Sequence, residues 1–296
     1  MNWSPFNPEF MTDPARGHQY LLNECPVHYC DMFEPPFYTL SRYGDVENAL
    51  RDIKTFSSHF GQGPRFTEPA GMLCDPPQHT QYRKLIQQAF TPKAVAELRP
   101  MVVSLANKLV DDILAGERGF DLHDDLAFPL PVIIIAGMLG VPAEDLEDFK
   151  RWSDMQVELM GSEDPSQYLD EQTRFQAYMH AHMMSRRSLI ESGAEVPEDL
   201  LTLVASAKTD TGEYIPDGDA LSMLNQLLVG GNETTTSLIT NMIWRLLEVP
   251  SLWQEILEDE SLMGAAVEES LRFDPPVLGL YRNTTRSVEL HGQIIP

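Results

Sequence analysis

One long apolar stretch with a weakened centre constrains the fold of this chain more than any other feature. The stretch runs from about Ala220 to Val249, and Pro250 follows it. Its length and apolar character predict a helix that ends before the proline. The middle, residues 230–236, reads Gly-Gly-Asn-Glu-Thr-Thr-Thr. Each glycine costs about 1 kcal/mol relative to alanine, and threonines are also poor helix formers, so this centre needs a compensating role.

The weak centre has a chemical interpretation. Glycine has no Cβ, so a flat ligand can approach the backbone at Gly230 and Gly231. The hydroxyl of Thr234 is predicted to donate to the carbonyl oxygen of Gly230, four residues back. Glu233 and Thr234 then supply an acid and an alcohol that could pass protons to a ligand in this groove. The alternative is a glycine-flexed helix with an ordinary polar stripe, and the segment alone does not separate the two.

Two further charged pairs stand at helical spacing. Glu269 and Arg272 are three residues apart, and such pairs occur on many solvated helices. His79 and Arg83 are one helical turn apart and would face the same way. In an acidic chain they form a plausible clamp for a carboxylate or phosphate, with Arg282 as a further donor. Taken singly, such a histidine and such an arginine are more often merely solvated.

The charge balance excludes several classes of partner. Forty-five acidic residues against twenty-one basic ones give a formal net charge of -24, which repels nucleic acid and anionic membranes. The first thirty residues contain no apolar run long enough for a signal or an anchor, so a cytoplasmic location is expected. Cys25, Cys30 and Cys74 are odd in number and lack zinc-type spacing, so neither a disulfide framework nor a structural metal is indicated.

The remaining pattern predicts a mainly α fold with small peripheral β-sheets. Val132–Leu139 is predicted to be a buried helix. Thr91 is predicted to cap a short helix, because Pro100 is expected to open the next one. The strand candidates are Phe37–Leu40 and Ser287–Ile295, the second with a tight turn inside it.

Three motifs in this order resemble the cytochrome P-450 family, specifically its soluble bacterial haem-thiolate monooxygenases. They are Asp75-Pro-Pro-Gln-His79-Thr-x-x-Arg83, Gly230-Gly-x-Glu-Thr234 and Glu269-x-x-Arg272-x-x-Pro275-Pro. The resemblance covers essentially the whole chain, so residues 1–296 are expected to form a single domain with the cytochrome P-450 fold, incomplete at the C-terminus. The cysteine loop that gives the family its axial ligand is expected to lie beyond Pro296.

The resemblance also implies roles for individual residues. Glu233 and Thr234 would be catalytic, with Thr234 ordering bound O2 and Glu233 relaying protons. Gly230 and Gly231 would lie against the cofactor, haem b. The haem propionates would be held by His79, Arg83 and Arg282. Glu269 and Arg272 match the buried structural pair of the family.

The function implied by the resemblance is insertion of one oxygen atom of O2 into a small apolar organic substrate. The expected lining comes from the loop Ser57–Leu73, from residues 220–234 and from the turn Val277–Leu280, which are mostly apolar or small. Electrons would come from a ferredoxin and its reductase, by analogy with the soluble bacterial members. Without the axial cysteine, haem binding and activity are expected only in the full-length protein, and the chain as given is expected to be inactive.

Two other functions were weighed. A helical metal-dependent lyase would need carboxylates on facing helices, but Asp124 and Asp125 lack a further acid nearby. His180 and His182 are two residues apart and fall on different helix faces, so they do not form a common metal site. A non-catalytic helical module that binds an apolar ligand is the second alternative, and the pairing of Glu233 with Thr234 argues against it.

Overall fold

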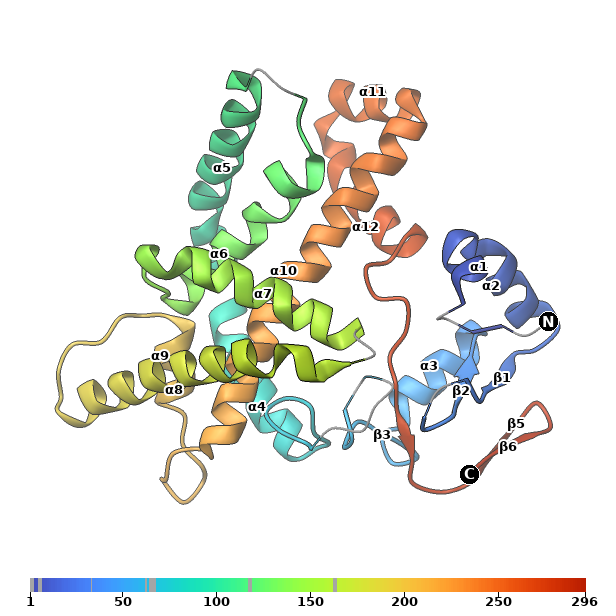
Figure 1. Cartoon of the computed structure of the whole chain (residues 1–296), viewed down its shortest axis with the longest axis horizontal. Coiled ribbons are helices and arrows are strands. Elements are labelled where there is room, and N and C mark those ends of the chain that lie inside the picture. The colour runs from blue at the N-terminus through green and yellow to red at the C-terminus, as the bar shows by residue number, and fades with distance from the viewer. Residues whose placement is uncertain are drawn as a thin grey trace. The chain divides into compact units, whose positions relative to one another are not determined.

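The computed structural model describes residues 3–4, 7–32, 34–61, 63, 68–116, 119–161 and 164–296. This described part is mainly helical, with three two-stranded antiparallel sheets (Figure 1). The predicted fold class is confirmed. Contacts divide the chain into two compact units, residues 1–80 with 279–296, and residues 81–278. That the whole chain forms one domain stays a prediction.

The first unit contains short helices and all three small sheets. The helices are α1 (Pro8–Thr12), α2 (Pro14–Asn23) and α3 (Tyr43–Arg51). The strands are β1 (Val27–Cys30), β2 (Phe37–Leu40), β3 (Phe56–Ser57), β4 (Asn283–Thr284), β5 (Val288–Leu290) and β6 (Gln293–Ile295). The pairs are β1 with β2, β3 with β4, and β5 with β6. The last segment of the chain therefore belongs to the N-terminal unit.

The C-terminal hairpin confirms the second strand prediction. Its turn consists of His291 and Gly292, with φ values of 50° and 76°. Glycine adopts this left-handed region without steric cost, and histidine adopts it only rarely. His291 is held there by a contact of 2.7 Å between its Nε2 and Oδ2 of Asp45 on α3. The turn is thus tied to the helix of its own unit.

The second unit is a helical assembly around one long helix, α10 (Asp217–Glu248), which contacts most of the helices around it (Figure 1). The α-helices around it are α5 (Pro92–Ala115), α6 (Pro129–Leu139), α7 (Leu146–Gly161), α8 (Leu169–Glu191), α9 (Leu200–Ala205), α11 (Pro250–Glu258) and α12 (Met263–Phe273). The short helical turns are η1 (Gln88–Phe90), η2 (His123–Ala127), η3 (Ala143–Asp145), η4 (Pro165–Tyr168) and η5 (Glu260–Leu262), of which η2 is a π-helix. The helix α4 (Gln78–Gln87) contains the division between the two units.

The helix α5 corrects one prediction. Thr91 caps it as expected, accepting a hydrogen bond from the backbone N–H of Ala94 at 3.2 Å. Pro100, however, lies inside α5 and does not open a new helix. Its ring is exposed, and the helix continues past it although Val102, Val103 and Ser104 are only moderate helix formers. A proline is therefore a poor boundary signal by itself.

The helix α6 is buried as predicted and forms the main partner of α10. Val132, Ile135 and Leu139 are at most 4% exposed. Gly140 ends the helix at a φ of 76°, the left-handed conformation that glycine favours at helix C-termini. The core side of α10 is equally apolar, and its buried members there include Ala220, Met223, Leu224, Leu227 and Leu228.

The two central glycines of α10, Gly230 and Gly231, have different surroundings. A Cβ on Gly231 would lie 2.9 Å from Cγ1 of Ile135, closer than real side chains approach one another. Gly231 is therefore required by the close packing of α10 on α6. A Cβ on Gly230 would meet no atom within 4 Å among the described residues, so the backbone there borders open space.

This difference predicts opposite effects of alanine at the two positions. Gly230→Ala should raise the free energy of unfolding by about 1 kcal/mol, because alanine is the better helix former and the space is open. Gly231→Ala should be about 1–3 kcal/mol less stable than Gly230→Ala, because the methyl group overpacks against Ile135. Urea unfolding followed by circular dichroism measures both. Equal stability of the two variants would contradict the packing role of Gly231.

Candidate functional site

The predicted alcohol, Thr234, and the predicted acid, Glu233, lie on neighbouring flanks of α10, close to the open space at Gly230. Oγ1 of Thr234 donates to the carbonyl oxygen of Gly230 at 2.9 Å. This confirms the hydrogen bond predicted from the sequence. The bond fixes the rotamer of Thr234 and occupies its proton, so the hydroxyl oxygen remains able to accept from a ligand beside Gly230. Consecutive residues in a helix point about 100° apart, so Glu233 projects from a different flank.

Glu233 lines a polar cavity of about 570 Å³. The other lining residues come from η2, the start of α6 and α7: His123, Asp124, Phe128, Pro129, Lys150, Asp154 and Glu158. Burial raises the pKa of Glu233, and the nearby Asp154 carboxylate raises it further, while His123 lowers it. A carboxyl group in this position holds a proton at a higher pH than an exposed glutamate does.

The side chain of Asn232 connects α10 to α7, and the sequence analysis missed it. It is completely buried. Its Nδ2 donates to Oγ of Ser153 on α7 at 2.6 Å, and lies 3.4 Å from Oε1 of Glu233. Its Oδ1 accepts from Oγ1 of Thr236 at 3.3 Å. An asparagine inside an apolar helix, with a threonine four residues later, is the signal that could have revealed this network.

The basic residues predicted to hold the propionates have no ion-pair partner among the described residues. His79 and Arg83 lie one turn apart on α4, with His79 half-buried and Arg83 exposed. Arg282 belongs to the first unit, and its Nη1 donates to the carbonyl oxygen of Tyr281 at 2.7 Å. Burial lowers the pKa of Arg282, and the charge of Asp75 offsets part of this effect. Arg83 and Arg282 belong to different units, and each guanidinium by itself is able to donate to an anionic ligand.

The pair of Glu269 and Arg272 forms, but its predicted burial is wrong for this chain. Nε and Nη2 of Arg272 both donate to the Glu269 carboxylate at 2.7 Å. The hydrogen bonds lower the pKa of Glu269 and raise that of Arg272. Yet the side chains of Arg272 and Glu269 are 67% and 60% exposed. The spacing alone is enough to form the pair, whereas burial needs covering residues that this part of the structure does not supply.

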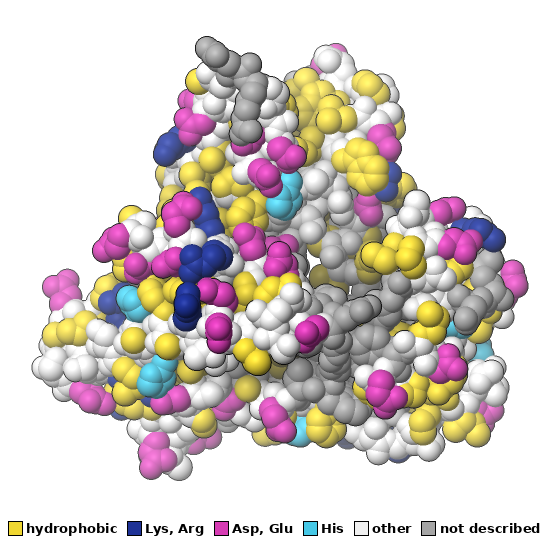
Figure 2. Space-filling model, in the orientation of Figure 1, with side chains coloured by type: hydrophobic (Ala, Val, Ile, Leu, Met, Phe, Trp, Pro, Cys, Tyr) yellow, Lys and Arg dark blue, Asp and Glu magenta, His cyan; other side chains and the backbone are white. Residues whose placement is uncertain are grey.

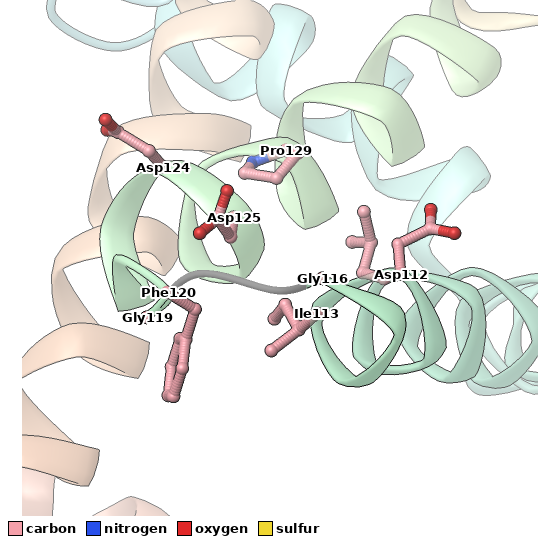
Figure 3. Close-up of a pocket in the computed structure, with 9 residues that line it drawn as sticks. Asp112, Ile113, Gly116, Gly119, Phe120, Asp124, Asp125 and Pro129 are labelled. Atoms are coloured by element: carbon pink, nitrogen blue, oxygen red, sulfur yellow. The ribbon is translucent and has the colours of Figure 1, made fainter.

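A second, smaller cavity of about 280 Å³ lies between the end of α5 and η2. Figure 3 shows Ile113 and Phe120 on its apolar side and Asp112 and Asp125 among its acidic groups. It shares Asp124 and Pro129 with the larger cavity, so η2 separates the two. Asp124 and Asp125 thus lie at a helical turn between cavities, and the lyase-type carboxylate site is not formed by them.

Several observations bear on other kinds of site. Acidic side chains are spread over the visible face of the molecule (Figure 2). Among the described residues, no three His, Cys, Asp or Glu side chains are arranged to hold a metal ion. In the same part of the chain, no helix is long and apolar enough to cross a membrane. Gln62 and residues 64–67, part of the loop predicted to line the substrate, lie outside the described residues.

Comparison with known proteins decides the family. A family model described as Cytochrome P450 matches residues 18–296. The chain belongs to the cytochrome P450 family. The putative cytochrome P450 YjiB of Bacillus subtilis (strain 168) is 32% identical over 286 residues, 95% of this P450 chain and 70% of that protein. The erythromycin C-12 hydroxylase of Saccharopolyspora erythraea is 37% identical over 263 residues, 86% and 64% of the two chains.

Solved structures agree with this assignment. A mutant of P450 EryK in complex with erythromycin B matches with a TM-score of 0.83 and 32% identity, over 97% of this chain and 72% of that one. Ligand-free cytochrome P450 TbtJ1 also gives a TM-score of 0.83, at 34% identity over 96% and 73% of the two chains. This P450 chain therefore spans about two thirds to three quarters of the length of these proteins.

Family membership confirms the predicted class, a haem-iron-dependent cytochrome P450 monooxygenase. It also decides against the two alternatives, the metal-dependent lyase and the non-catalytic module. The residues of this chain fit a haem group in two respects: open space beside Gly230, and basic side chains with no ion-pair partner in the described structure. The separate roles of the site residues stay predictions.

Removal of the Asn232 side chain tests the connection between α10 and α7. Asn232→Ala should lower the free energy of unfolding by about 1–3 kcal/mol, because two buried hydroxyls lose their hydrogen-bond partner. Thr235→Ala is the control, since Thr235 is an exposed neighbour on the same helix. It should change stability by less than about 0.5 kcal/mol. Urea unfolding measures the free energy of unfolding of both variants. Equal decreases in the two would contradict a stabilising role for the hydrogen bonds of Asn232.

Proposed function

We propose that this P450 inserts one oxygen atom of O2 into a small, mainly apolar organic substrate, with electrons from a ferredoxin-type partner and its reductase. The observation that carries the proposal is the arrangement around residues 230–234 of α10. The hydroxyl of Thr234 donates to the backbone of Gly230, beside which there is open space. Glu233, whose pKa is raised, lines a polar cavity on the neighbouring flank of α10. An alcohol and an acid on neighbouring flanks of one helix are the groups that proton delivery to a ligand beside Gly230 requires.

The haem b group would lie along α10 at Gly230, with its propionates held by His79, Arg83 and Arg282. Guanidinium groups suit this task because they present several fixed donors to a carboxylate and stay charged. When bound, the haem iron supplies the redox chemistry that activates O2. Gly231 is not needed for this contact, because the packing against Ile135 already explains it.

The residues of the chain then divide the remaining work. Thr234 would accept a hydrogen bond at Oγ1 and so position a ligand or water beside Gly230, because its own proton is held by the Gly230 carbonyl. Glu233 would donate a proton from its carboxyl group and be reprotonated from the polar cavity. Its raised pKa increases the protonated fraction near neutral pH, which favours the donor role.

The substrate class follows from the groove and from the names of relatives. Relatives include an erythromycin C-12 hydroxylase and a vitamin D(3) 25-hydroxylase, names that describe hydroxylation of organic molecules. For this chain the expected lining is apolar, and Leu278 and Leu280 are 80% and 49% exposed in the turn after α12. We therefore propose hydroxylation of an unactivated C–H bond in an apolar region of the substrate.

Replacement of Thr234 tests the alcohol directly. In the haem-loaded full-length protein, Thr234→Ala should lower the product formed per electron pair consumed by at least about tenfold, with the loss appearing as hydrogen peroxide. The reason is that the ordered hydroxyl no longer directs protons in the groove. The control Thr235→Ala changes an exposed threonine one residue on and should leave this ratio unchanged. Product and peroxide are quantified together, and unchanged coupling in Thr234→Ala would remove the alcohol from the proposal.

Replacement of Arg83 tests the haem clamp. A hydrogen bond to a charged group contributes about 1.5–3 kcal/mol, so Arg83→Ala should speed haem loss by about tenfold to a hundredfold. Lys84→Ala removes the same charge from the adjacent exposed position of α4, which points about 100° away, and should leave haem loss unchanged. Transfer of haem to an acceptor protein gives the rate. Equal rates in the two variants would exclude Arg83 as a propionate ligand.

A further inference from the structure

A second carboxylate, that of Asp154, lines the cavity beside Glu233. Asn232 joins the two helices: its Nδ2 donates to Ser153 of α7 at 2.6 Å and lies 3.4 Å from Oε1 of Glu233. Asp154 follows Ser153 in the sequence, and both Asp154 and Glu233 line the same cavity. The buried amide therefore ties α10 to α7 beside the cavity that both carboxylates line.

The cavity is suited to hold water. Its volume of about 570 Å³ is many times the roughly 30 Å³ that a water molecule occupies in the liquid. Its charged walls come from two elements besides α10: His123 and Asp124 from η2, and Lys150, Asp154 and Glu158 from α7. Phe128 and Pro129, at the start of α6, also line the cavity, and neither has a titratable side chain. Water in such a polar space has partners on several sides and can connect the titrating groups.

The charges in the cavity act on the two carboxylates together. Loss of solvation raises the pKa of Asp154, as does Glu158, while His123 and Lys150 lower it. Asp154 in turn raises the pKa of Glu233, and His123 lowers that value. Each of the two carboxyl groups therefore holds its proton to a higher pH than an exposed carboxyl group of the same type does.

Glu158 is the less suitable partner, although it lines the same cavity. Loss of solvation raises the pKa of the Tyr168 hydroxyl and Glu158 raises it further, so this carboxylate also acts on a group outside the lining of the cavity. Its charge acts on Asp154, and it is not among the groups that shift Glu233. Asp154 is therefore the carboxylate of α7 whose charge acts on the acid of α10.

His123 connects this cavity with solvent. Its side chain is 52% exposed, and its Nδ1 lies 2.8 Å from Oδ1 of Asp124. Its ring stacks on Phe128, with 5.8 Å between the ring centroids and 18° between the planes. The π-helical turn η2 carries it, a backbone form found frequently at functional sites. The imidazole is therefore in contact with solvent and also lines the cavity.

We propose that Asp154 relays protons to Glu233 through water in this cavity, with His123 as the group that takes them from solvent. The proposal rests on the proposed function, since it specifies how the acid of α10 is reprotonated. Each transfer breaks one N–H or O–H bond and forms another. A proton passes from the His123 imidazolium to water and Asp154, and then to the Glu233 carboxylate, which has given up its own proton. Asp154 acts only through Glu233.

The first test measures protonation and does not depend on turnover. In the haem-loaded full-length protein, the infrared carboxyl band of Glu233 is identified by its loss in Glu233→Gln and titrated with pH. Asp154→Asn should lower the pKa of Glu233, because a neighbouring negative charge is removed. His123→Gln should raise it, because a positive charge is removed. Glu158→Gln, the control on the same helix and cavity, should shift it less than Asp154→Asn does.

The second test measures proton delivery. Asp154→Asn should slow substrate oxidation by about tenfold and increase the solvent deuterium isotope effect, whereas Glu158→Gln should stay within about twofold of the parent. Asp154→Glu keeps the carboxyl group and should restore most of the rate. If Asp154→Asn does not fold, as judged by circular dichroism, His123→Gln and Asp154→Glu still decide the matter. The relay predicts an increased isotope effect in His123→Gln and a near-parent one in Asp154→Glu.

The outcomes separate the relay from the proposed function. Glu233→Gln should itself slow oxidation by about a hundredfold. If Glu233→Gln leaves the rate unchanged, the proposed role of the acid fails, whatever Asp154 does. If Glu233→Gln slows the reaction but Asp154→Asn behaves like Glu158→Gln in both tests, the relay is wrong and the proposed function stands.

Discussion

The packing of α10 against α6 and α7 is the constraint on which the candidate site depends. Gly231 lets α10 approach Ile135 of α6, and Asn232 donates to Ser153 of α7. Once these two residues face the neighbouring helices, the geometry of a helix leaves no freedom for the residues beside them. Gly230 and Thr234 must border the open groove, and Glu233 must face the cavity. The unfavourable helix formers at the centre of α10 are thus compensated by packing on one side and by the site on the other.

Local chemistry was predictable from the sequence, and contacts between distant elements were not. The bond from Thr234 to Gly230 could be predicted because a threonine in a helix reaches the carbonyl four residues back. The role of Gly231 could not, because Ile135 is far away in the sequence and nothing in the local pattern distinguishes a glycine that faces a helix from one that faces a ligand. The Glu269–Arg272 pair shows the same division: its spacing predicts the ion pair, and its exposure depends on tertiary contacts.

The polar cavity beside Glu233 shows why sequence reasoning found the acid but not its surroundings. Asn232 and Ser153 are 79 residues apart, and their hydrogen bond links α10 to α7, the helix that carries Asp154. His123 reaches the same cavity from η2, a π-helical turn that no propensity rule predicts. Asp124 and Asp125 drew attention only as possible metal ligands, whereas the structure places them on the wall between two cavities. The groups that shift the pKa of Glu233 are therefore brought together by the packing of distant segments and not by a short sequence motif.

Arg83 and Arg282 differ in how much a bound anion would stabilise them, and the stabilisation should be larger for Arg282. An exposed arginine such as Arg83 keeps its hydration and needs no partner. Arg282 is partly desolvated, which lowers its pKa and disfavours the charged form. The nearby carboxylate of Asp75 is already engaged with the hydroxyl of Ser57 and the backbone N–H of Ser58. Arg282 has lost part of its solvation and makes no ion pair within the described residues. A bound anion would therefore stabilise it more than it would stabilise an exposed arginine, because less water must be displaced from the guanidinium. Arg282 is therefore the arginine whose environment more strongly favours a bound carboxylate.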